Sequence, residues 1–312
     1  MKRTFRKGIV ISAAAVALSA LVACQPKQSV AQSDAAPERA GWTYVGGDEF
    51  NGSSLDPANW KAYHNTYGDG NNELACLTPA NVKETGGILV IASQRETVTC
   101  PSGSVRKYTS GFIGSREAGR YYPMFGRFEM RARVPHAQGL WPAFWLRHRR
   151  GAGVAEVDVL EYFHSQVPGK GTATLHLDGR RNLLQKSVFF ESPQNDGQFH
   201  TWAVEISPVG NDVKFEFFLD DRPFGSYVDT QHNWKDGTDP NATWDIAVNQ
   251  AVGGNWTGDP DGVLGYLPGV GRCSIGGTAP SGCVTTGINR VDWSDLADVA
   301  YLVDYVRVYT RS

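Results

Sequence analysis

The chain has 312 residues, with 30 Lys and Arg against 32 Asp and Glu, and its formal net charge is −2. Four of the basic residues lie within residues 1–23, so the remainder has 26 basic and 32 acidic residues and a net charge of −6. This balance excludes the strongly basic surface of a nucleic-acid-binding protein. The length allows one large all-β domain, because such domains often exceed 200 residues.

Residues 1–23 have the three parts of a secretory signal. A basic start at residues 2–7 precedes the mostly apolar run Gly8–Val22, which is short for a membrane span, and a small residue follows. The tetrad Leu21-Val22-Ala23-Cys24 resembles the lipobox of bacterial lipoproteins. The resemblance implies lipidation at Cys24 and attachment to the bacterial cell envelope, at the outer membrane, the cell surface or in the periplasm. An ordinary cleavage site and an uncleaved anchor are the alternatives.

Residues 24–41 are rich in Gln, Ala, Ser, Pro and charged residues, so we expect a flexible tether. From Trp42 onward the composition is uniform and has no internal repeat. We therefore predict one domain over residues 42–312, and we expect a monomer.

Alternating polar and apolar residues predict β-strands in this domain. The alternation is unbroken in Arg127–Val134 and extends over most of Val213–Leu219, where Asp220-Asp221-Arg222-Pro223 predicts a turn. Further strands are predicted at Thr201–Ile206, Trp244–Val248 and Tyr301–Tyr309. With 35 Gly and 16 Pro and no clear helical stripe, the pattern favours a sandwich or jelly roll over an α/β fold.

Four cysteines remain after Cys24, namely Cys76, Cys100, Cys273 and Cys283. In an exported protein they predict two disulfides, for which three pairings can form. Pairing by proximity in the sequence gives Cys76–Cys100 and Cys273–Cys283. No CxxC pair or close Cys/His cluster indicates a metal site instead.

The segment Glu156–Phe163 carries three acids within six residues. As a strand, it places Glu156 and Asp158 on one face, whereas strict alternation would turn Glu161 into the core. Burial of an unpaired carboxylate is unfavourable, so we predict a β-bulge near Val159 or Leu160 that returns Glu161 to the first face. A solvated acidic face is the alternative interpretation.

Three converging acids suit glycoside hydrolysis. Their mutual repulsion raises the pKa of at least one carboxyl, so that a protonated and an ionised acid coexist at neutral pH. Retaining hydrolysis uses such a pair at a separation of roughly 5–5.5 Å. We predict that Glu156 attacks the anomeric carbon, that Glu161 is the acid and base, and that Asp158 orients Glu156.

Several motifs resemble glycoside hydrolase family 16, in the order in which the family has them. They are Gly70-Asn71-Asn72-Glu73-Leu74, Phe125–Glu129, Gly139–Trp145, the acid cluster, Thr174-Leu175-His176, Ala251–Trp256 and Val303–Tyr309. The ExDxxE form resembles the laminarinases of that family. The resemblance implies an all-β jelly roll of two antiparallel sheets with a concave substrate cleft, and it gives Glu156, Asp158 and Glu161 the roles stated above.

The same resemblance suggests residues that bind the substrate. Trp141, Trp145 and Trp256 are expected to stack on sugar rings, and His176 to form hydrogen bonds in the cleft; core packing or a structural role is the alternative for each. No cofactor is expected for catalysis. Some relatives bind a structural calcium ion, and Asp304 with Glu49 or Asp48 matches that placement.

Two features differ from similar laminarinases. Ala75-Cys76 follows Leu74 where a glutamine is common, and Arg147-His148-Arg149-Arg150 forms a predicted basic loop. That loop is interpreted either as solvated or as a contact for an anionic or sulfated glycan.

We expect an endo-acting retaining hydrolase of a polysaccharide, with β-1,3-glucan as the first substrate. The alternatives are a galactan hydrolase of the agar, carrageenan or porphyran type, a transglycosylase, and a non-catalytic carbohydrate-binding protein. The last alternative would be expected to lack a catalytic glutamate, and both are present.

Overall fold

The computed structural model describes residues 38–66, 71–135, 137–148, 155–162, 170–177, 185–191, 197–230, 243–254, 256–257, 259–261, 266–267, 271–272 and 291–312. The predicted signal, Cys24, most of the tether, Cys273 and Cys283 lie outside these ranges. Within them, no helix has both the length and the apolar character needed to cross a membrane.

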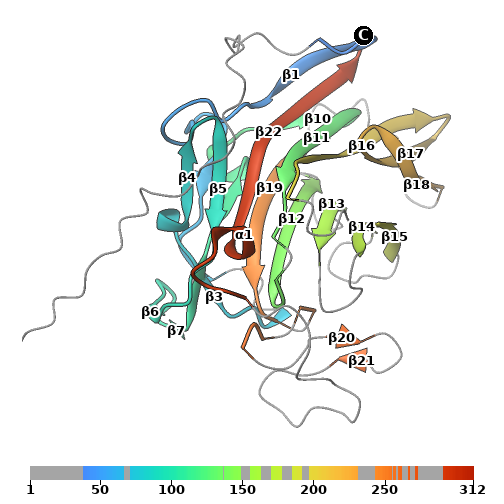
Figure 1. Ribbon diagram of the computed structural model, residues 1–312. Coiled ribbons are helices and arrows are strands. Elements are labelled where there is room, and N and C mark those ends of the chain that lie inside the picture. The colour runs from blue at the N-terminus through green and yellow to red at the C-terminus, as the bar shows by residue number, and fades with distance from the viewer. Residues whose placement is uncertain are drawn as a thin grey trace, which may run out of the picture. The chain divides into compact units, whose positions relative to one another are not determined.

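Two antiparallel sheets dominate the described part of the chain (Figure 1). Sheet A has the order β18-β17-β16-β11-β22-β5-β4, with β1 also paired to β22. Its strands are β1 (Trp42–Asp48), β4 (Val82–Thr85), β5 (Ile88–Ala92), β11 (Gly126–Arg133), β16 (His200–Val209), β17 (Asp212–Leu219), β18 (Arg222–Asp229) and β22 (Ala300–Arg311).

Sheet B has the order β15-β14-β13-β12-β19-β9-β2, with β10 also paired to β19. Its strands are β2 (Lys61–Ala62), β9 (Phe112–Gly114), β10 (Tyr122–Pro123), β12 (Leu140–His148), β13 (Glu156–Tyr162), β14 (Lys170–His176), β15 (Gln185–Glu191) and β19 (Thr243–Val252). The predicted all-β sandwich is therefore confirmed, and each predicted strand lies within or overlaps an observed one.

The remaining elements are short. Strand pairs outside the two sheets are β3 (Ala75–Leu77) with β8 (Tyr108–Ser110), β6 (Val98–Thr99) with β7 (Val105–Arg106), and β20 (Tyr266–Leu267) with β21 (Gly271–Arg272). The described helices are the 3-10 turns η2 (Pro79–Asn81) and η3 (Arg116–Ala118) and the α-helix α1 (Leu296–Val299).

The main core consists of the inward faces of the two sheets. Alternation gives each strand one apolar face, and burial of these faces against each other removes them from water. Sheet A contributes Phe128, Met130, Val204, Ile206, Val306 and Val308, and sheet B contributes Phe144, Leu146, Val157, Val159, Ile246 and Val248. The outward face of sheet B is consequently left to carry polar and aromatic side chains.

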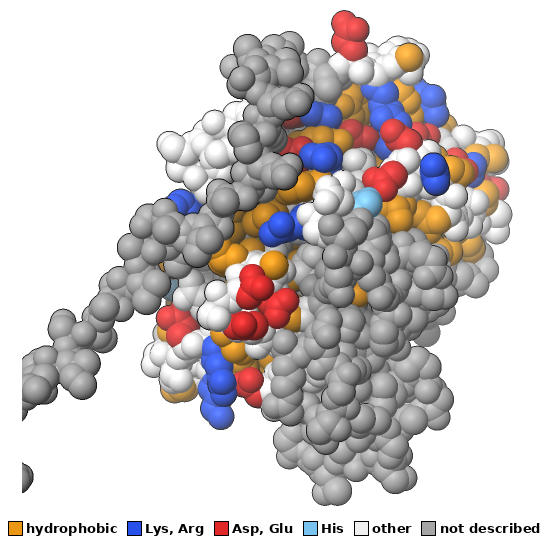
Figure 2. Space-filling model, viewed as in Figure 1, with side chains coloured by type: hydrophobic (Ala, Val, Ile, Leu, Met, Phe, Trp, Pro, Cys, Tyr) orange, Lys and Arg blue, Asp and Glu red, His pale blue; other side chains and the backbone are white. Residues whose placement is uncertain are grey.

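The folded unit begins before Trp42. Arg39 forms a β-bridge with Trp42 and an ion pair of 2.6 Å with Asp221, and the Ser312 N–H donates to the Gly41 carbonyl. The end of the predicted tether is therefore bound to sheet A. In the upper part of Figure 2, acidic and basic side chains of the described residues lie side by side on the surface.

Candidate active site

The three acids of β13 lie on one face because the strand contains an irregular residue. Leu160 pairs with Phe144 and Asp158 pairs with Trp145, so Val159 has no partner on β12. The register on the β14 side shifts between Asp158 and Glu161 as well. This shift lies where the sequence predicted a bulge. As a result, Val159 and Leu160 are both buried in the core.

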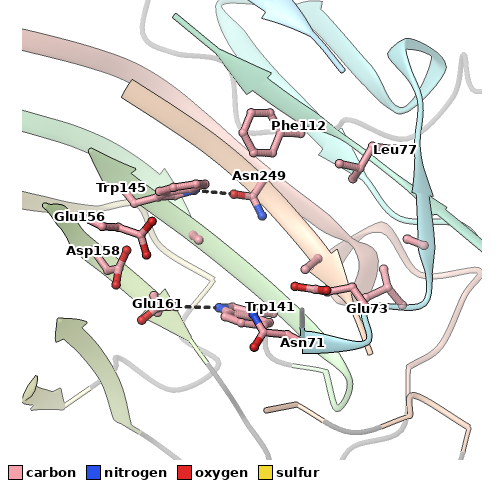
Figure 3. A pocket seen from close by; sticks show the side chains of 14 residues that line it. Asn71, Glu73, Leu77, Phe112, Trp141, Trp145, Glu156, Asp158, Glu161 and Asn249 are labelled. Atoms are coloured by element: carbon pink, nitrogen blue, oxygen red, sulfur yellow. Dashed lines mark hydrogen bonds between the residues drawn. The ribbon is translucent and has the colours of Figure 1, made fainter. Parts of the chain in front are cut away.

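Glu156, Asp158 and Glu161 all line one pocket of about 180 Å³ on sheet B. Figure 3 shows their carboxyl groups pointing into the same space as the rings of Trp141 and Trp145. The side chain of Glu156 is 40% exposed and that of Asp158 only 5%. Glu156 is thus the more accessible of these two acids to a substrate.

The neighbouring strand β14 supplies the polar partners of these acids. His176 Nε2 lies 3.1 Å from Asp158 Oδ2 and 4.0 Å from Glu156 Oε1. Thr174 forms a hydrogen bond with Glu161. The predicted position of His176 near the catalytic acids is therefore observed, although it contacts Asp158 rather than the proposed acid and base.

Burial and mutual repulsion favour protonation of the cluster. Burial, followed by Asp158 and Glu156, raises the pKa of Glu161 well above its usual range, despite hydrogen bonds from Trp141 and Thr174. Burial also raises the pKa of Asp158, and His176 opposes that rise. At neutral pH the cluster can therefore hold a proton on Glu161.

Burial and then Asp158 raise the pKa of Glu156 to about 8, and cations limit this rise. His176, Arg147 and Arg116 all favour the ionised form of Glu156. Because the Glu156 side chain is also the better solvated, it is the acid best placed to be ionised while Glu161 is protonated.

Two tryptophans form the floor of the pocket. Trp141 Nε1 donates to Glu161 Oε1 over 3.1 Å, and Trp145 Nε1 donates to Asn249 Oδ1 over 2.7 Å. Both side chains are at most 9% exposed and line the pocket. Their rings offer an apolar surface whose orientation is fixed by hydrogen bonds, which suits the C–H face of a sugar ring.

Trp256 lies apart from this floor. It is not among the described residues that line the pocket, and its Nε1 donates to Asn71 Oδ1 over 3.0 Å. Asn71 does line the pocket. Trp256 therefore holds a pocket residue in place, and a direct contact of its ring with the substrate stays a prediction.

Several pocket residues were given no role from the sequence. They are Asn71, Glu73, Leu77, Phe112 and Asn249. Asn71 and Glu73 stand in the Asn-Asn-Glu-Leu motif, which the sequence analysis had matched to the family, so these two could have been predicted. Asn249 is one of several polar residues of β19 and was not distinguished from the others. Phe112 carried no signal, because an apolar residue in a short strand ordinarily indicates the core.

A glycine allows the segment of Asn71 and Glu73 to approach the pocket. Gly254 has φ +110°, and a Cβ atom there would lie 2.8 Å from the Asn71 carbonyl oxygen. A side chain would therefore be strained and would also displace this segment. The Leu74 N–H donates to the Val252 carbonyl over 2.7 Å, which fixes the same segment to the end of β19.

The disulfide predicted between Cys76 and Cys100 is confirmed. Cys76 is the central residue of β3, between the pocket residues Ala75 and Leu77. The bond therefore fastens one wall of the pocket to a segment 24 residues further along the chain.

Of the three carboxylates predicted to bind calcium, Asp304 and Glu49 each have an arginine partner. Arg131 donates to Asp304 over 2.5 Å, and Arg307 binds both carboxylate oxygens of Glu49, at 2.7 and 2.8 Å. Asp48 accepts hydrogen bonds from Trp60 and from the Phe50 backbone. Calcium binding at these residues stays a prediction.

The basic segment after Trp145 differs from the prediction. Arg147 and His148 belong to β12 and are buried, rather than lying in a solvated loop. Arg147 binds Asp245 Oδ1 over 2.6 Å and Glu117 Oε2 over 3.2 Å. Its charge is therefore already engaged within the protein, and Arg149 and Arg150 lie outside the described residues.

One cluster of nitrogen and oxygen atoms has a spacing that a metal ion could also use. One such atom each from Glu156, Asp158 and His176 lies within 4.8 Å of the others. A hydrogen bond between His176 and Asp158, in which the two side chains share a proton, accounts for this spacing. We assign a hydrogen-bonded cluster of acids and an imidazole.

Comparison with known proteins agrees with this geometry. Residues 59–264 match glycosyl hydrolases family 16. The chain belongs to this family. Its fold and its acids on one sheet face are those that the sequence motifs led us to expect of a glycoside hydrolase.

Relatives of this family 16 chain include two that resemble it over most of their length. A beta-glucanase of Rhodothermus marinus is 31% identical over 263 residues, covering 77% of this chain and 85% of the relative. A glucan endo-1,3-beta-glucosidase of Cryptopygus antarcticus is 29% identical over 245 residues, covering 70% and 83%. The solved laminarinase of Rhodothermus marinus has a TM-score of 0.63 at 27% identity, covering 87% of this chain and 98% of that one.

Proposed function

We propose that this chain is a retaining endo-β-glucanase that cleaves β-1,3-glucan. The observation that supports this most is the convergence of Glu156, Asp158 and Glu161 in one pocket with a tryptophan floor. The names of the relatives support the substrate. The ExDxxE spacing with its irregular residue supports a laminarinase-type arrangement.

The reaction follows from the protonation states of the two glutamates. Ionised Glu156 attacks the anomeric carbon, the bond from that carbon to the leaving oxygen breaks, and Glu161 gives its proton to that oxygen. A glycosyl ester on Glu156 results. Glu161, now ionised, takes a proton from water, and the oxygen of that water attacks the anomeric carbon and releases the Glu156 carboxylate.

Asp158 and His176 assist this reaction without bonding to the substrate. Asp158 lies between the glutamates along β13 and is hydrogen-bonded to His176. This contact fixes Asp158, whose charge then favours the protonated form of Glu161 before attack. Trp141 donates to Glu161 and so holds its carboxyl toward the pocket.

Product analysis tests the proposal. The purified protein and Glu156→Gln would be incubated with laminarin, mixed-linkage glucan, agarose, carrageenan and sulfated galactan. Release of short oligosaccharides from laminarin by the wild type alone is the expected result. Cleavage of a galactan but not laminarin would replace the substrate and keep the chemistry. Binding of a glycan without cleavage of any would indicate a carbohydrate-binding protein.

We also propose that the chain is exported and lipid-anchored through Cys24. The basic start, the apolar run and the Leu-Val-Ala-Cys tetrad support this. Radiolabelled palmitate should label the protein expressed in a bacterium and should not label Cys24→Ser. Equal labelling of both would contradict the anchor.

A further inference from the structure

Beside Glu156, four charged or titratable side chains lie on one row across sheet B. Asp245 on β19 pairs with Arg147 on β12, Arg147 pairs with Glu156 on β13, and Glu156 pairs with His176 on β14. Residues directly opposite in antiparallel strands have Cβ atoms about 4.5–5.5 Å apart on the same face. Arg147 is thus flanked by an acid on each side.

Arg147 is fixed in this row by contacts on three sides. It binds Asp245 Oδ1 over 2.6 Å and Glu117 Oε2 over 3.2 Å. Its guanidinium carbon lies 5.3 Å from the centre of the Trp145 ring and 5.8 Å from that of Phe112. With its side chain only 6% exposed, the guanidinium has one defined place beside the pocket floor.

Asp245 does not by itself account for Arg147. Arg116 already binds the other oxygen of this carboxylate, with Nε and Nη2 at 2.8 and 2.7 Å from Oδ2. Two guanidinium groups therefore share one fully buried carboxylate. The two arginines carry one more positive charge than the Asp245 carboxylate neutralises, and this charge can act on Glu117 and on Glu156.

We propose that Arg147 is a positioning residue for Glu156, favouring the ionised carboxylate through its fixed guanidinium on the adjacent strand. Glu117 competes for the same guanidinium and therefore tunes this effect. Tyr63 donates to Glu117 Oε1 over 2.7 Å and keeps that carboxylate in place. The proposal rests on the proposed function, in which Glu156 must be ionised to attack.

Among the described residues, charged groups on four elements act on Glu156. Asp158 and Glu161 on its own strand favour the protonated form, and His176 on β14 favours the ionised form. Arg147 on β12 and Arg116 in η3 add to the ionising side. Removing a charge from Arg147 or from Glu117 should therefore move the pKa of Glu156 in opposite directions.

The test is direct titration of Glu156 in the purified protein. Carbon-13 NMR of Cδ-labelled glutamate would follow each carboxyl with pH, and Glu156→Gln would identify the signal by its loss. Arg147→Met should raise the pKa of Glu156 by about 0.5–1 unit, and Glu117→Gln should lower it by about 0.5 unit. Arg131→Met, which removes an arginine from sheet A, should leave it unchanged.

The acidic limb of the pH profile of kcat/KM on laminarin should move in the same directions. An unchanged Glu156 pKa in both variants, or a shift of the same sign in both, would overturn the proposal. If Arg147→Met does not fold, Glu117→Gln decides alone, because its amide oxygen can still accept from Tyr63. An inactive wild type would refute the proposed function, whereas the titration would still decide the role of Arg147.

Discussion

The two sheets of this sandwich both bury acids on a strand face, but with different partners. On sheet A, the buried Arg127 binds Glu129 over 2.8 Å, Glu205 over 3.1 Å and Asp221 over 2.7 Å. The arginine side chain is only 1% exposed, so these contacts replace the water that its charge has lost. This cluster ties β11, β16 and the turn after β17 together.

On sheet B, the acids outnumber the cations that reach them. Glu156, Asp158 and Glu161 share one pocket. Among the contacts of the described residues, His176 is the basic side chain within hydrogen-bonding distance of these acids. Arg147, which pairs with Glu156 across the sheet, forms its ion pairs with Glu117 and Asp245 instead. The cluster therefore keeps protons that it can donate.

The pKa directions show what this difference does. Although burial opposes it, Arg39 and Arg127 lower the pKa of Asp221 below its ordinary value. In contrast, burial and the neighbouring acids raise the pKa of Glu161 well above its ordinary value. Matched acids stabilise the fold, whereas unmatched acids destabilise their charged forms and supply acid–base chemistry.

The largest expected effect is on catalysis at sheet B. Glu156→Gln should reduce hydrolysis of laminarin at least about a thousandfold, equivalent to ~4 kcal/mol of transition-state stabilisation, because a neutral amide cannot form the glycosyl ester. Reducing-sugar release measures the activity, and circular dichroism checks the fold. Retention of more than a tenth of the activity would assign the nucleophile elsewhere.

The next effect is on stability at sheet A. Arg127→Met should lower the free energy of unfolding by about 3 kcal/mol, because it leaves three acids without their shared cation. Urea denaturation measures the loss, and kcat of the folded fraction should be unchanged. Arg131→Met is the matched control: this arginine is 38% exposed and should contribute about 1 kcal/mol or less. Equal losses of unfolding free energy in both variants would show that burial of the arginine does not set its contribution to stability.

Glu161→Gln should stabilise the protein while abolishing rapid hydrolysis. Glu161 has a raised pKa in the folded state, whereas a glutamate in the unfolded state has a pKa of about 4.3. The folded state therefore binds the proton of Glu161 more tightly, and the stability of the wild type falls as the pH rises from about 4.3 toward the folded pKa. The variant lacks this loss and should gain on the order of 1–2 kcal/mol at pH 8 and little at pH 4. Thermal unfolding at both pH values measures the gain, and a variant less stable than wild type at pH 8 would contradict it.

The smallest effect has the opposite sign. Asp221 has a lowered folded pKa, so its contribution is present above the unfolded value of about 3.9 and is lost as pH falls through the folded value. Its side chain is 61% exposed, so Asp221→Asn should cost less than about 1 kcal/mol at pH 7 and nothing measurable near pH 2. A larger loss of stability at low pH than at pH 7 would show that the lowered pKa of Asp221 is not the source of its contribution to stability.

The sequence was sufficient for the fold and the acids because both depend on local pattern. Unbroken alternation at Arg127–Val134 predicts a strand with one buried face, and the strand is observed as β11. The irregular residue near Val159 followed from the unfavourable burial of Glu161, and the register shift lies there. Each inference used residues within one strand.

Arg147 and Trp256 could not be placed in this way. A run of basic residues ordinarily indicates solvent, whereas Arg147 is buried because Asp245, 98 residues away in the chain, lies beside it. Trp256 contacts Asn71 across 185 residues, and no local pattern reports that contact. Residues whose role depends on distant partners therefore need the tertiary structure.

The anomeric configuration of the first product tests the central claim most directly. Proton NMR would follow laminarin hydrolysis by the purified protein from the first minutes, before the released sugar mutarotates. Two displacements through Glu156 predict that the β anomer forms first, with the α anomer appearing later. The α anomer appearing first would mean a single displacement by water, and it would contradict Glu156 as nucleophile.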